Sequence, residues 1–287
     1  MYFTQLSAAK LNLFLRVTNK RRDGYHDIVS LFLRLPAVET LSISKAKDAT
    51  DEVRVRGVEV DGENIVARAL RRAREAGFNV PFLDVEISKT IYPGSGLGAG
   101  SGNAAAILRW LAGSAARQEN DFISQKWQNV ALKTGADVPF LLSGYPLALV
   151  SGIGEILEPL KPLRLSASIV FPEWSVGTEN AYNQLDNRFG GKYPLSESEA
   201  LGEACALRRK LMNKERVGLL PNDFAPMLIE KFPDYLNLFD MFDKSGHIAW
   251  GITGSGGAAF ALSERTPFPL AVAWPSWVRQ VLTLDIS

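Results

Sequence analysis

The sequence predicts an α+β protein of two domains. Segments with strand periodicity and segments with helical periodicity are mixed along the 287 residues, without the strict alternation of a doubly wound fold. The composition is globular, with 46% hydrophobic and 22% charged residues. The length suits two domains better than one. Pro159 and Pro162 place the expected boundary near residue 160, which gives domains 1–160 and 161–287.

The N-terminal half begins with predicted strands. Branched and aromatic residues predict strands at 11–18 and 38–44, with a turn at Asp23-Gly24 between them. Valine alternates with charged residues over 51–60, which is the period of a half-buried strand. Residues 82–89 have the same character and predict a further strand.

Helical periodicity appears at 63–78, where Ala69 and Ala73 share an apolar face. The four arginines of this segment are accompanied by Glu63 and Glu75, which favours a solvated helix face over an anion-binding patch. A second helix is predicted at 103–112.

The C-terminal half contains a predicted strand at 165–172 and a polar stretch at 186–202, which we interpret as a surface excursion. A second glycine cluster, in the stretch 251–262, lies between two strand-like segments, 247–250 and 258–262.

Charge and cysteine content exclude several classes of function. The chain has 32 basic and 31 acidic side chains, so it has no general field for nucleic acid or an anionic membrane, and neither is an expected partner. Cys205 is the only cysteine, which excludes an intramolecular disulfide and fits a reducing compartment. The longest uncharged runs contain Gly, Ser and Pro and do not resemble a membrane span. We therefore expect a soluble, cytoplasmic protein.

The segment YPGSGLGAGSGNAAAILRWL places glycine at every second position from Gly94 to Gly102, directly before a predicted helix. Backbone N–H groups without side chains around them can converge on phosphate oxygens, and the helix adds the positive end of its dipole. The chain has no GxxxxGK[ST] motif, which excludes a P-loop. A match to the dinucleotide fingerprint is weak, because the run follows Tyr92-Pro93 rather than a buried parallel strand. We interpret the run as a phosphate-binding loop rather than a flexible surface loop.

Four stretches together resemble the GHMP kinases, the family of the galacto-, homoserine, mevalonate and phosphomevalonate kinases. They follow the family's order and span nearly the whole chain: AAKLNLFLRVTNKRRDGYHDI, PGSGLGAGSGNAAA, GADVPFLLSG with GIGE, and GITGSGGAAF. The resemblance implies an N-terminal domain like the second domain of ribosomal protein S5 and a ferredoxin-like C-terminal domain, with the active site in the cleft between them. It also implies ATP as phosphate donor, Mg²⁺ with the nucleotide, and a monomer or weak homodimer.

The resemblance assigns catalysis to Asp137 and Lys10. Asp137 stands among small and apolar residues and matches the family's catalytic aspartate, which accepts the proton of the reacting hydroxyl. Lys10 matches a lysine beside it, where a cation keeps the carboxylate ionised and stabilises developing negative charge. Without the resemblance, Asp137 could equally be a turn residue and Lys10 an exposed strand-end charge.

The substrate is implied by the Gly-Tyr-His stretch. In related enzymes the tyrosine stacks on cytosine and the histidine reads the edge of the base, which here indicates Tyr25 and His26. Phe32 would complete the pocket, Asn12 would orient the acceptor hydroxyl, and Thr178 matches a further substrate-side residue. The function implied is phosphorylation of the 2-hydroxyl of cytidylated methylerythritol, a step of the non-mevalonate route to isoprenoid precursors.

The resemblance places the nucleotide on the glycine run and on two residues near the adenine. These candidate ATP-binding residues are Pro93, Gly94, Ser95, Gly96, Leu97, Gly98, Ala99, Gly100, Ser101, Gly102, Asn103, Asn64 and Lys89. The second glycine cluster, Gly254 to Gly257, resembles a family loop that packs against the phosphate loop, although a tight turn between strands would explain it as well.

The glycine run departs from the family pattern at three positions. Ser95 and Ala99 replace glycines, and Gly102 replaces a serine whose hydroxyl is expected near the metal-bound phosphates. Two alternatives follow: another GHMP-type kinase that acts on a different small alcohol, such as homoserine or mevalonate, and a catalytically impaired nucleotide-binding relative.

Overall fold

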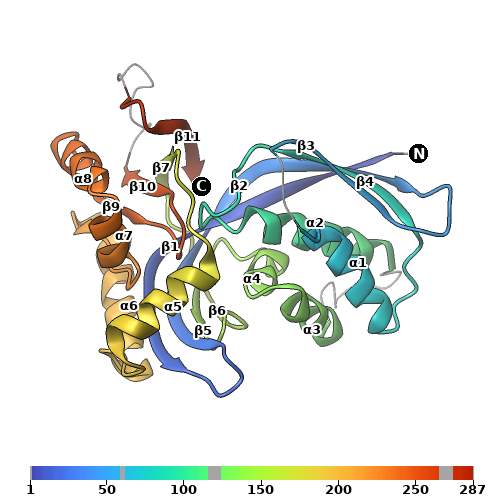
Figure 1. Cartoon of the computed structure of the whole chain (residues 1–287), viewed down its shortest axis with the longest axis horizontal. Helices are drawn as coiled ribbons and strands as arrows, with labels where there is room; N and C mark the ends of the chain where they lie inside the picture. Colours follow the sequence, from blue (N-terminus) through green and yellow to red (C-terminus); the bar gives the residue numbers. More distant parts are fainter. Residues whose placement is uncertain (1, 59–61, 116–123, 265–273, 287) are drawn as a thin grey trace. The chain divides into compact units, whose positions relative to one another are not determined.

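The computed structural model describes residues 2–58, 62–115, 124–264 and 274–286 (Figure 1). Two long strands, β1 (Phe3–Lys20) and β2 (His26–Lys45), begin the chain and pair with each other. The turn between them contains Gly24, whose φ of 88° lies in the left-handed region that glycine adopts without strain. The strands predicted at 11–18 and 38–44 are confirmed and are longer than expected.

Packing divides the chain into two compact units. Unit 1 comprises residues 1–10, 37–93 and 98–145, and unit 2 comprises residues 11–36, 94–97 and 146–287. Each unit therefore contains part of β1 and part of β2. This grouping does not follow chain order, and the linear boundary near residue 160 stays a prediction.

Unit 1 has a sheet that is covered by helices on one face (Figure 1). Its strands are β3 (Glu52–Gly57), β4 (Leu83–Lys89) and the C-terminal part of β2, in the order β3-β4-β2. β3 and β4 are parallel, and β2 runs antiparallel to β4. The strands predicted at 51–60 and 82–89 are thus confirmed within the described residues.

The helices of unit 1 are α1 (Ile65–Glu75), α2 (Ala99–Ala115), α3 (Gln125–Thr134) and α4 (Val138–Ser143). α1 connects β3 to β4 and presents Val66, Ala69, Leu70 and Ala73 to the core. Its arginines pair with acidic neighbours, as in the 2.9 Å contact between Arg68 and Glu63, so the predicted solvated face is confirmed.

Unit 2 contains the N-terminal part of β2 with β5 (Leu147–Ser151) and β6 (Ile156–Leu160), which pair in that order. Its second sheet has the order β11-β7-β10-β9-β8. The strands are β7 (Leu165–Pro172), β8 (Gly218–Leu219), β9 (Ala249–Ile252), β10 (Ala259–Ser263) and β11 (Val278–Ile286). All eight residues of β7 are buried, and β10 and β11 pair with its two edges.

Four helices complete unit 2: α5 (Thr178–Phe189), α6 (Glu197–Met212), α7 (Ala225–Lys231) and α8 (Asp234–Lys244). The stretch 186–202, predicted as a surface excursion, is largely exposed and consists of the end of α5, a short connection and the beginning of α6. Ser196 and Glu199 form a capping box that starts α6, and a polar sequence of this kind resembles a loop when it is read by composition alone. The α+β class is confirmed.

Candidate active site

Lys10 and Asp137 form an ion pair within unit 1, with 3.7 Å between Nζ and Oδ2. Lys10 lies on β1 with only 5% of its side chain exposed, whereas the Asp137 side chain is 28% exposed. Burial lowers the pKa of Lys10, and the charge of Asp137 opposes this shift. Asp137 occupies the N-cap position of α4, but its side chain makes no capping hydrogen bond. The carboxylate therefore faces Lys10 and solvent rather than the helix end.

The beginning of α2 lies against this pair. A Cβ atom at Gly98 would come within 2.9 Å of Asp137 Oδ2 and 3.3 Å of Lys10 Cε, so only glycine allows the backbone to approach so closely. α2 starts one residue later, at Ala99, and the amide of Gly102 makes its first hydrogen bond, 2.9 Å to the carbonyl of Gly98. The N–H groups of the first turn, at 99–101, precede that bond and are available to an anion.

The glycines of the loop alternate in conformation with their neighbours. Gly94, Gly96 and Gly98 have φ values of 72°, 84° and 63°, while the residues between them do not adopt positive φ. Alternation of left-handed glycines with residues of negative φ is the backbone pattern found in anion-binding nests. The positive φ values of the loop glycines are compatible with the phosphate-loop interpretation, and binding of a phosphate by this loop stays a prediction.

Gly102 is explained by packing. A Cβ atom at this position would lie 1.8 Å from the carbonyl oxygen of Ala8 and 3.0 Å from Ser7 Oγ. The backbone of α2 thus touches the backbone of β1, and a serine at 102 would force the helix and strand apart. The close approach of α2 to β1 at this position therefore depends on glycine.

The two residues predicted near the adenine have structural partners in unit 1. The side chain of Asn64 caps α1 by accepting a hydrogen bond of 2.9 Å from the amide of Val66. Lys89 is buried at the end of β4, and its ammonium lies 3.2 Å from Glu39 Oε1. Contact of either residue with a nucleotide stays a prediction.

Unit 2 connects residues 94–97 of the loop to the second glycine cluster. The amides of Gly257 and Ala258 donate hydrogen bonds of 3.0 Å to the carbonyls of Gly94 and Ser95. A Cβ atom at Gly96 would lie 2.0 Å from the carbonyl oxygen of Thr253. The second cluster therefore packs directly on the first, as the family resemblance implied.

Asn12, the predicted acceptor-orienting residue, is buried in β1 and fixed by hydrogen bonds within unit 2. Its side-chain amide donates to Ser30 Oγ at 2.9 Å, and its backbone N–H donates to Thr253 Oγ1 at 3.0 Å. Thr253 Oγ1 also lies 3.4 Å from the carbonyl of Gly96. Asn12 is thereby linked through one hydroxyl to the glycine loop.

His26 belongs to a cluster of polar and aromatic side chains in unit 2. Its Nε2 lies 2.7 Å from Asp186 Oδ1, and its ring stacks on Tyr182 with 4.6 Å between centroids. Lys20 Nζ and the hydroxyl of Tyr193 also donate to the Asp186 carboxylate. Burial by itself would raise the pKa of Asp186, but these three hydrogen bonds outweigh it and lower the pKa to about 2.

The other predicted substrate residues differ in accessibility. Tyr25 is 57% exposed and Thr178 is exposed at the first position of α5, so both can meet a ligand. Phe32 is only 1% exposed within β2. Its contact with a base stays a prediction.

Several residues of these clusters were not predicted from the sequence. Glu39 lies on the buried face of β2, two residues before Leu41 and four before Ile43, and this period of two could have identified it as a buried carboxylate. Asp186 and Tyr193 were missed because they fall within the stretch interpreted as a surface excursion. No local signal connects Thr253 to Asn12, which is 241 residues away.

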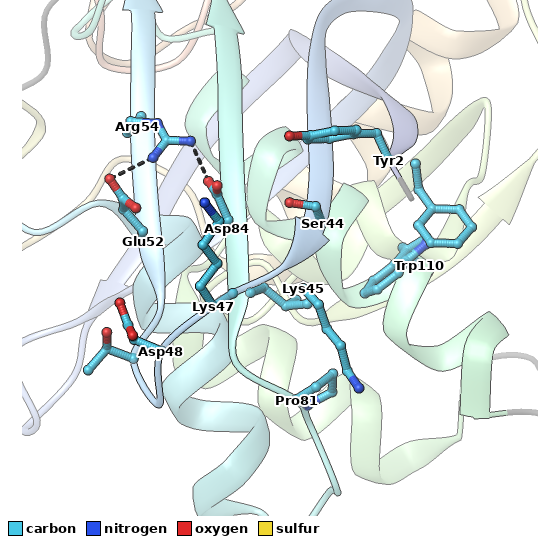
Figure 2. A pocket seen from close by; sticks show the side chains of 14 residues that line it. Tyr2, Ser44, Lys45, Lys47, Asp48, Glu52, Arg54, Pro81, Asp84 and Trp110 are labelled. Atoms are coloured by element: carbon cyan, nitrogen blue, oxygen red, sulfur yellow. Dashed lines mark hydrogen bonds and ion pairs between the residues drawn. The ribbon is translucent and has the colours of Figure 1, made fainter.

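A separate cavity of about 670 Å³ is lined by residues of unit 1, and Figure 2 shows its lining. Tyr2 and Trp110 lie on one side of it, and Arg54 lies on the other, 2.6 Å from both Glu52 and Asp84. None of the residues predicted for the active site lines this cavity. Because its basic groups are accompanied by a similar number of acidic ones, the cavity does not indicate a charged ligand.

Two further observations concern metal and membrane. The described residues contain no group of three or more His, Cys, Asp or Glu side chains that could hold a metal ion. Over the same part of the chain, no helix is both long and apolar enough to cross a bilayer.

The sequence is similar to those of known kinases. The family model described as GHMP kinases N terminal domain matches residues 64–145. The 4-diphosphocytidyl-2-C-methyl-D-erythritol kinase of Porphyromonas gingivalis is 32% identical over 265 residues, which cover 90% of this chain and 91% of that protein. The protein of the same name from Thermotoga maritima is 36% identical over 264 residues, with 90% of each chain covered.

Solved structures give the same picture. A crystal structure of 4-(cytidine 5'-diphospho)-2C-methyl-D-erythritol kinase superposes with a TM-score of 0.69 at 28% identity, and it covers 91% of this chain and 90% of its own. Homoserine kinase from Cytophaga hutchinsonii superposes with a TM-score of 0.58 at 18% identity, over 92% of this chain and 85% of that one. The second likeness concerns the fold alone.

Proposed function

The chain belongs to the 4-diphosphocytidyl-2-C-methyl-D-erythritol kinase family of the GHMP kinases, and from this premise we propose that it transfers the γ-phosphoryl group of ATP to the 2-hydroxyl of 4-diphosphocytidyl-2-C-methyl-D-erythritol. The observation that carries the proposal is the Lys10–Asp137 pair against Gly98 at the beginning of α2. This arrangement combines a base, a cation and an anion-binding helix end within unit 1.

The triphosphate would be held by backbone N–H groups of the glycine loop and of the first turn of α2. These groups are preorganised by the positive φ values of the loop glycines and by the helix that follows. The approach of Gly98 to Asp137 would leave the γ-phosphate near the carboxylate. A substrate hydroxyl placed between them would be aligned for attack.

Asp137 would accept the proton of that hydroxyl. As the new O–P bond forms, the O–H bond breaks, its proton passes to the carboxylate and ADP leaves. Lys10 would stabilise the negative charge that develops on the transferred group, and its burial strengthens that interaction by excluding water.

Mg²⁺ would be bound mainly by the phosphate oxygens of the nucleotide. The donor set agrees with this, since the described residues offer no metal cluster of their own and Asp137 is the carboxylate beside Gly98. The ion would neutralise part of the phosphate charge, and the protein would position the nucleotide.

Recognition of the acceptor would rest on unit 2. The exposed ring of Tyr25 can stack on cytosine, and His26 can hydrogen-bond to the edge of the base. Asn12, fixed by Ser30 and Thr253, would hold the acceptor end.

The test is turnover of Mg-ATP and 4-diphosphocytidyl-2-C-methyl-D-erythritol by the purified protein, followed as ADP release. Asp137→Asn should lower kcat by about 10²- to 10⁴-fold. Asp240→Asn is the matched control, because Asp240 is an exposed residue that pairs with Lys244 on α8, and it should leave kcat unchanged. Absence of turnover by the wild type, together with phosphorylation of homoserine or mevalonate, would replace the proposed substrate.

A further inference from the structure

Glu39 is a buried carboxylate with four donors. Its side chain has 0% exposure and lies on the core face of β2. Oε1 accepts from the amides of Thr90 and Ile91 at 3.1 and 2.9 Å, and Oε2 accepts from Asn103 Nδ2 at 2.9 Å. The ammonium of Lys89 lies 3.2 and 3.4 Å from the two oxygens. Both oxygens are thus satisfied, which a buried carboxylate requires.

These donors come from the two sides of the glycine loop. Residues 89–91 immediately precede Tyr92 and the first glycine, and Asn103 directly follows the last glycine, in the second turn of α2. One side chain on a neighbouring strand therefore holds the entry and the exit of the loop together. The hydrogen bonds fix two backbone amides on one side and a helix on the other.

The hydrogen bond to Glu39 determines the orientation of the Asn103 side chain. The side-chain amide donates to Glu39, while its Oδ1 is buried without a hydrogen-bond partner among the described residues. A buried acceptor without a partner costs free energy. The hydrogen bond from the Asn103 amide to Glu39 therefore stabilises this orientation by more than the unsatisfied Oδ1 destabilises it. Since Asn103 belongs to α2, the same bond sets the position of the helix whose first turn faces Lys10 and Asp137.

We propose that Glu39 is the positioning residue of the phosphate loop: its carboxylate fixes both ends of the loop and thereby preorganises the N–H groups that bind the triphosphate. Glu39 does not touch the nucleotide but acts through Lys89, residues 90–91 and Asn103. The inference rests on the proposed function in that it takes a nucleotide as the ligand of the loop. It also gives Lys89 a defined task, as the counter-ion of Glu39.

The test compares Glu39→Gln with the wild type in the steady state and in calorimetric titration with ADP, at a temperature well below the melting point of each variant. The substituted side chain keeps the shape of glutamate but has one acceptor oxygen in place of two and no charge. We expect KM for ATP and Kd for ADP to rise about 10- to 100-fold, with KM for the cytidylated substrate within about twofold of wild type. Glu86→Gln is the matched control, because Glu86 on β4 pairs with the largely exposed Arg56, and it should change neither constant.

A double-mutant cycle separates positioning from general loss of structure. Asn103→Leu removes the link to α2 while leaving Glu39 its other three donors, and it also serves if Glu39→Gln does not fold. If Glu39 acts through Asn103, the double variant raises KM for ATP no further than the more damaging single variant. The proposal is overturned if the two substitutions raise KM for ATP multiplicatively. It is also overturned if Glu39→Gln folds and binds ADP as tightly as the wild type does.

The same experiment distinguishes this proposal from the proposed function. ADP binding reports the phosphate loop whatever the acceptor, so tight ADP binding by the wild type without turnover of the cytidylated substrate would overturn only the substrate assignment. A wild-type protein that binds no ADP would overturn both.

Discussion

His26 Nε2 and Asp186 Oδ1 are joined by a hydrogen bond of 2.7 Å. With its pKa lowered to about 2, the Asp186 carboxylate is ionised at neutral pH and can only accept. Nε2 therefore carries the proton, and in the neutral imidazole Nδ1 is left as an acceptor. An acceptor at that position suits the exocyclic amino group of cytosine, which is a donor.

Replacing Asp186 should weaken recognition of the cytidylated substrate and leave ATP binding intact. In Asp186→Ala the imidazole loses the partner that fixes its tautomer, so we expect KM for the cytidylated substrate to rise about tenfold. KM for ATP should stay within about twofold, because Asp186 contacts no part of the glycine loop among the described residues. Steady-state kinetics with each substrate varied in turn measures both. An equal rise in the two constants would contradict this reasoning.

Asp186 should also contribute to acid stability. A carboxylate whose pKa is lower in the folded state stabilises the protein fully above its unfolded pKa, and that contribution is lost as the pH falls from 3.8 toward 2. The free energy of unfolding of the wild type should exceed that of Asp186→Asn by about 1 kcal/mol at pH 6, after discounting for solvent screening, and the difference should shrink below pH 4. Urea unfolding at pH 6 and pH 3 measures it. A difference that does not vary with pH would exclude an ionic origin.

Two glycines of α2 offer a matched pair of substitutions. Gly102→Ala should destabilise the protein by about 1–3 kcal/mol or more, because the new Cβ would overlap the carbonyl of Ala8. Gly100→Ala should be neutral or stabilise by up to about 1 kcal/mol, because a Cβ there meets only Ile65 Cγ2 at 3.7 Å and alanine favours the helix. Thermal unfolding of the two variants without ligand measures the contrast. Similar melting points for both would refute the close approach of α2 to β1.

Lys10→Met should separate activity from stability. The buried ammonium is desolvated, as the lowered pKa of Lys10 indicates, and its partner Asp137 is 3.7 Å away and partly solvated. Such a pair contributes little net stability, so the free energy of unfolding should fall by no more than about 1 kcal/mol, or rise. Turnover should fall by about 10²- to 10³-fold because the developing charge loses its cation. Lys244→Met, at an exposed pair on α8, is the control for both measurements. Loss of folding in Lys10→Met would show that the lysine is structural.

Strands, helices and the catalytic pair were predictable because their signals are local or belong to a recognisable motif. The alternation of apolar and polar residues in β4 and the helical period of α1 result from burial of one face of each element. The glycine run marks backbone that other groups approach too closely for side chains to fit. The family resemblance carried by the GADVPF stretch indicates Asp137, and the structure places it beside Lys10. The catalytic role of each residue stays a prediction.

The missed residues depend on contacts between distant segments. Glu39 has the composition of an ordinary strand residue, and its importance lies in donors 50 to 64 residues further along the chain. Asp186 and Tyr193 are polar residues in a polar stretch that was predicted as a surface excursion, and nothing in its composition indicates that they contact His26 or Lys20. Composition cannot distinguish these cases without the partner.

The interleaving of the two units along the chain has a kinetic consequence. The amide of Asn12 donates a hydrogen bond to Thr253, 241 residues later, and the amide of Leu15 donates to the carbonyl of Pro221. The earliest part of unit 2 can therefore form these contacts only after the segments around Pro221 and Thr253 have been synthesised. Closing such long loops before their contacts form is slow. During synthesis, residues 11–36 therefore leave the ribosome well before these partners exist, and their apolar side chains stay exposed for that interval. The chain should accordingly fold late, in a step that follows release, and depend on chaperones more than a protein whose domains are consecutive.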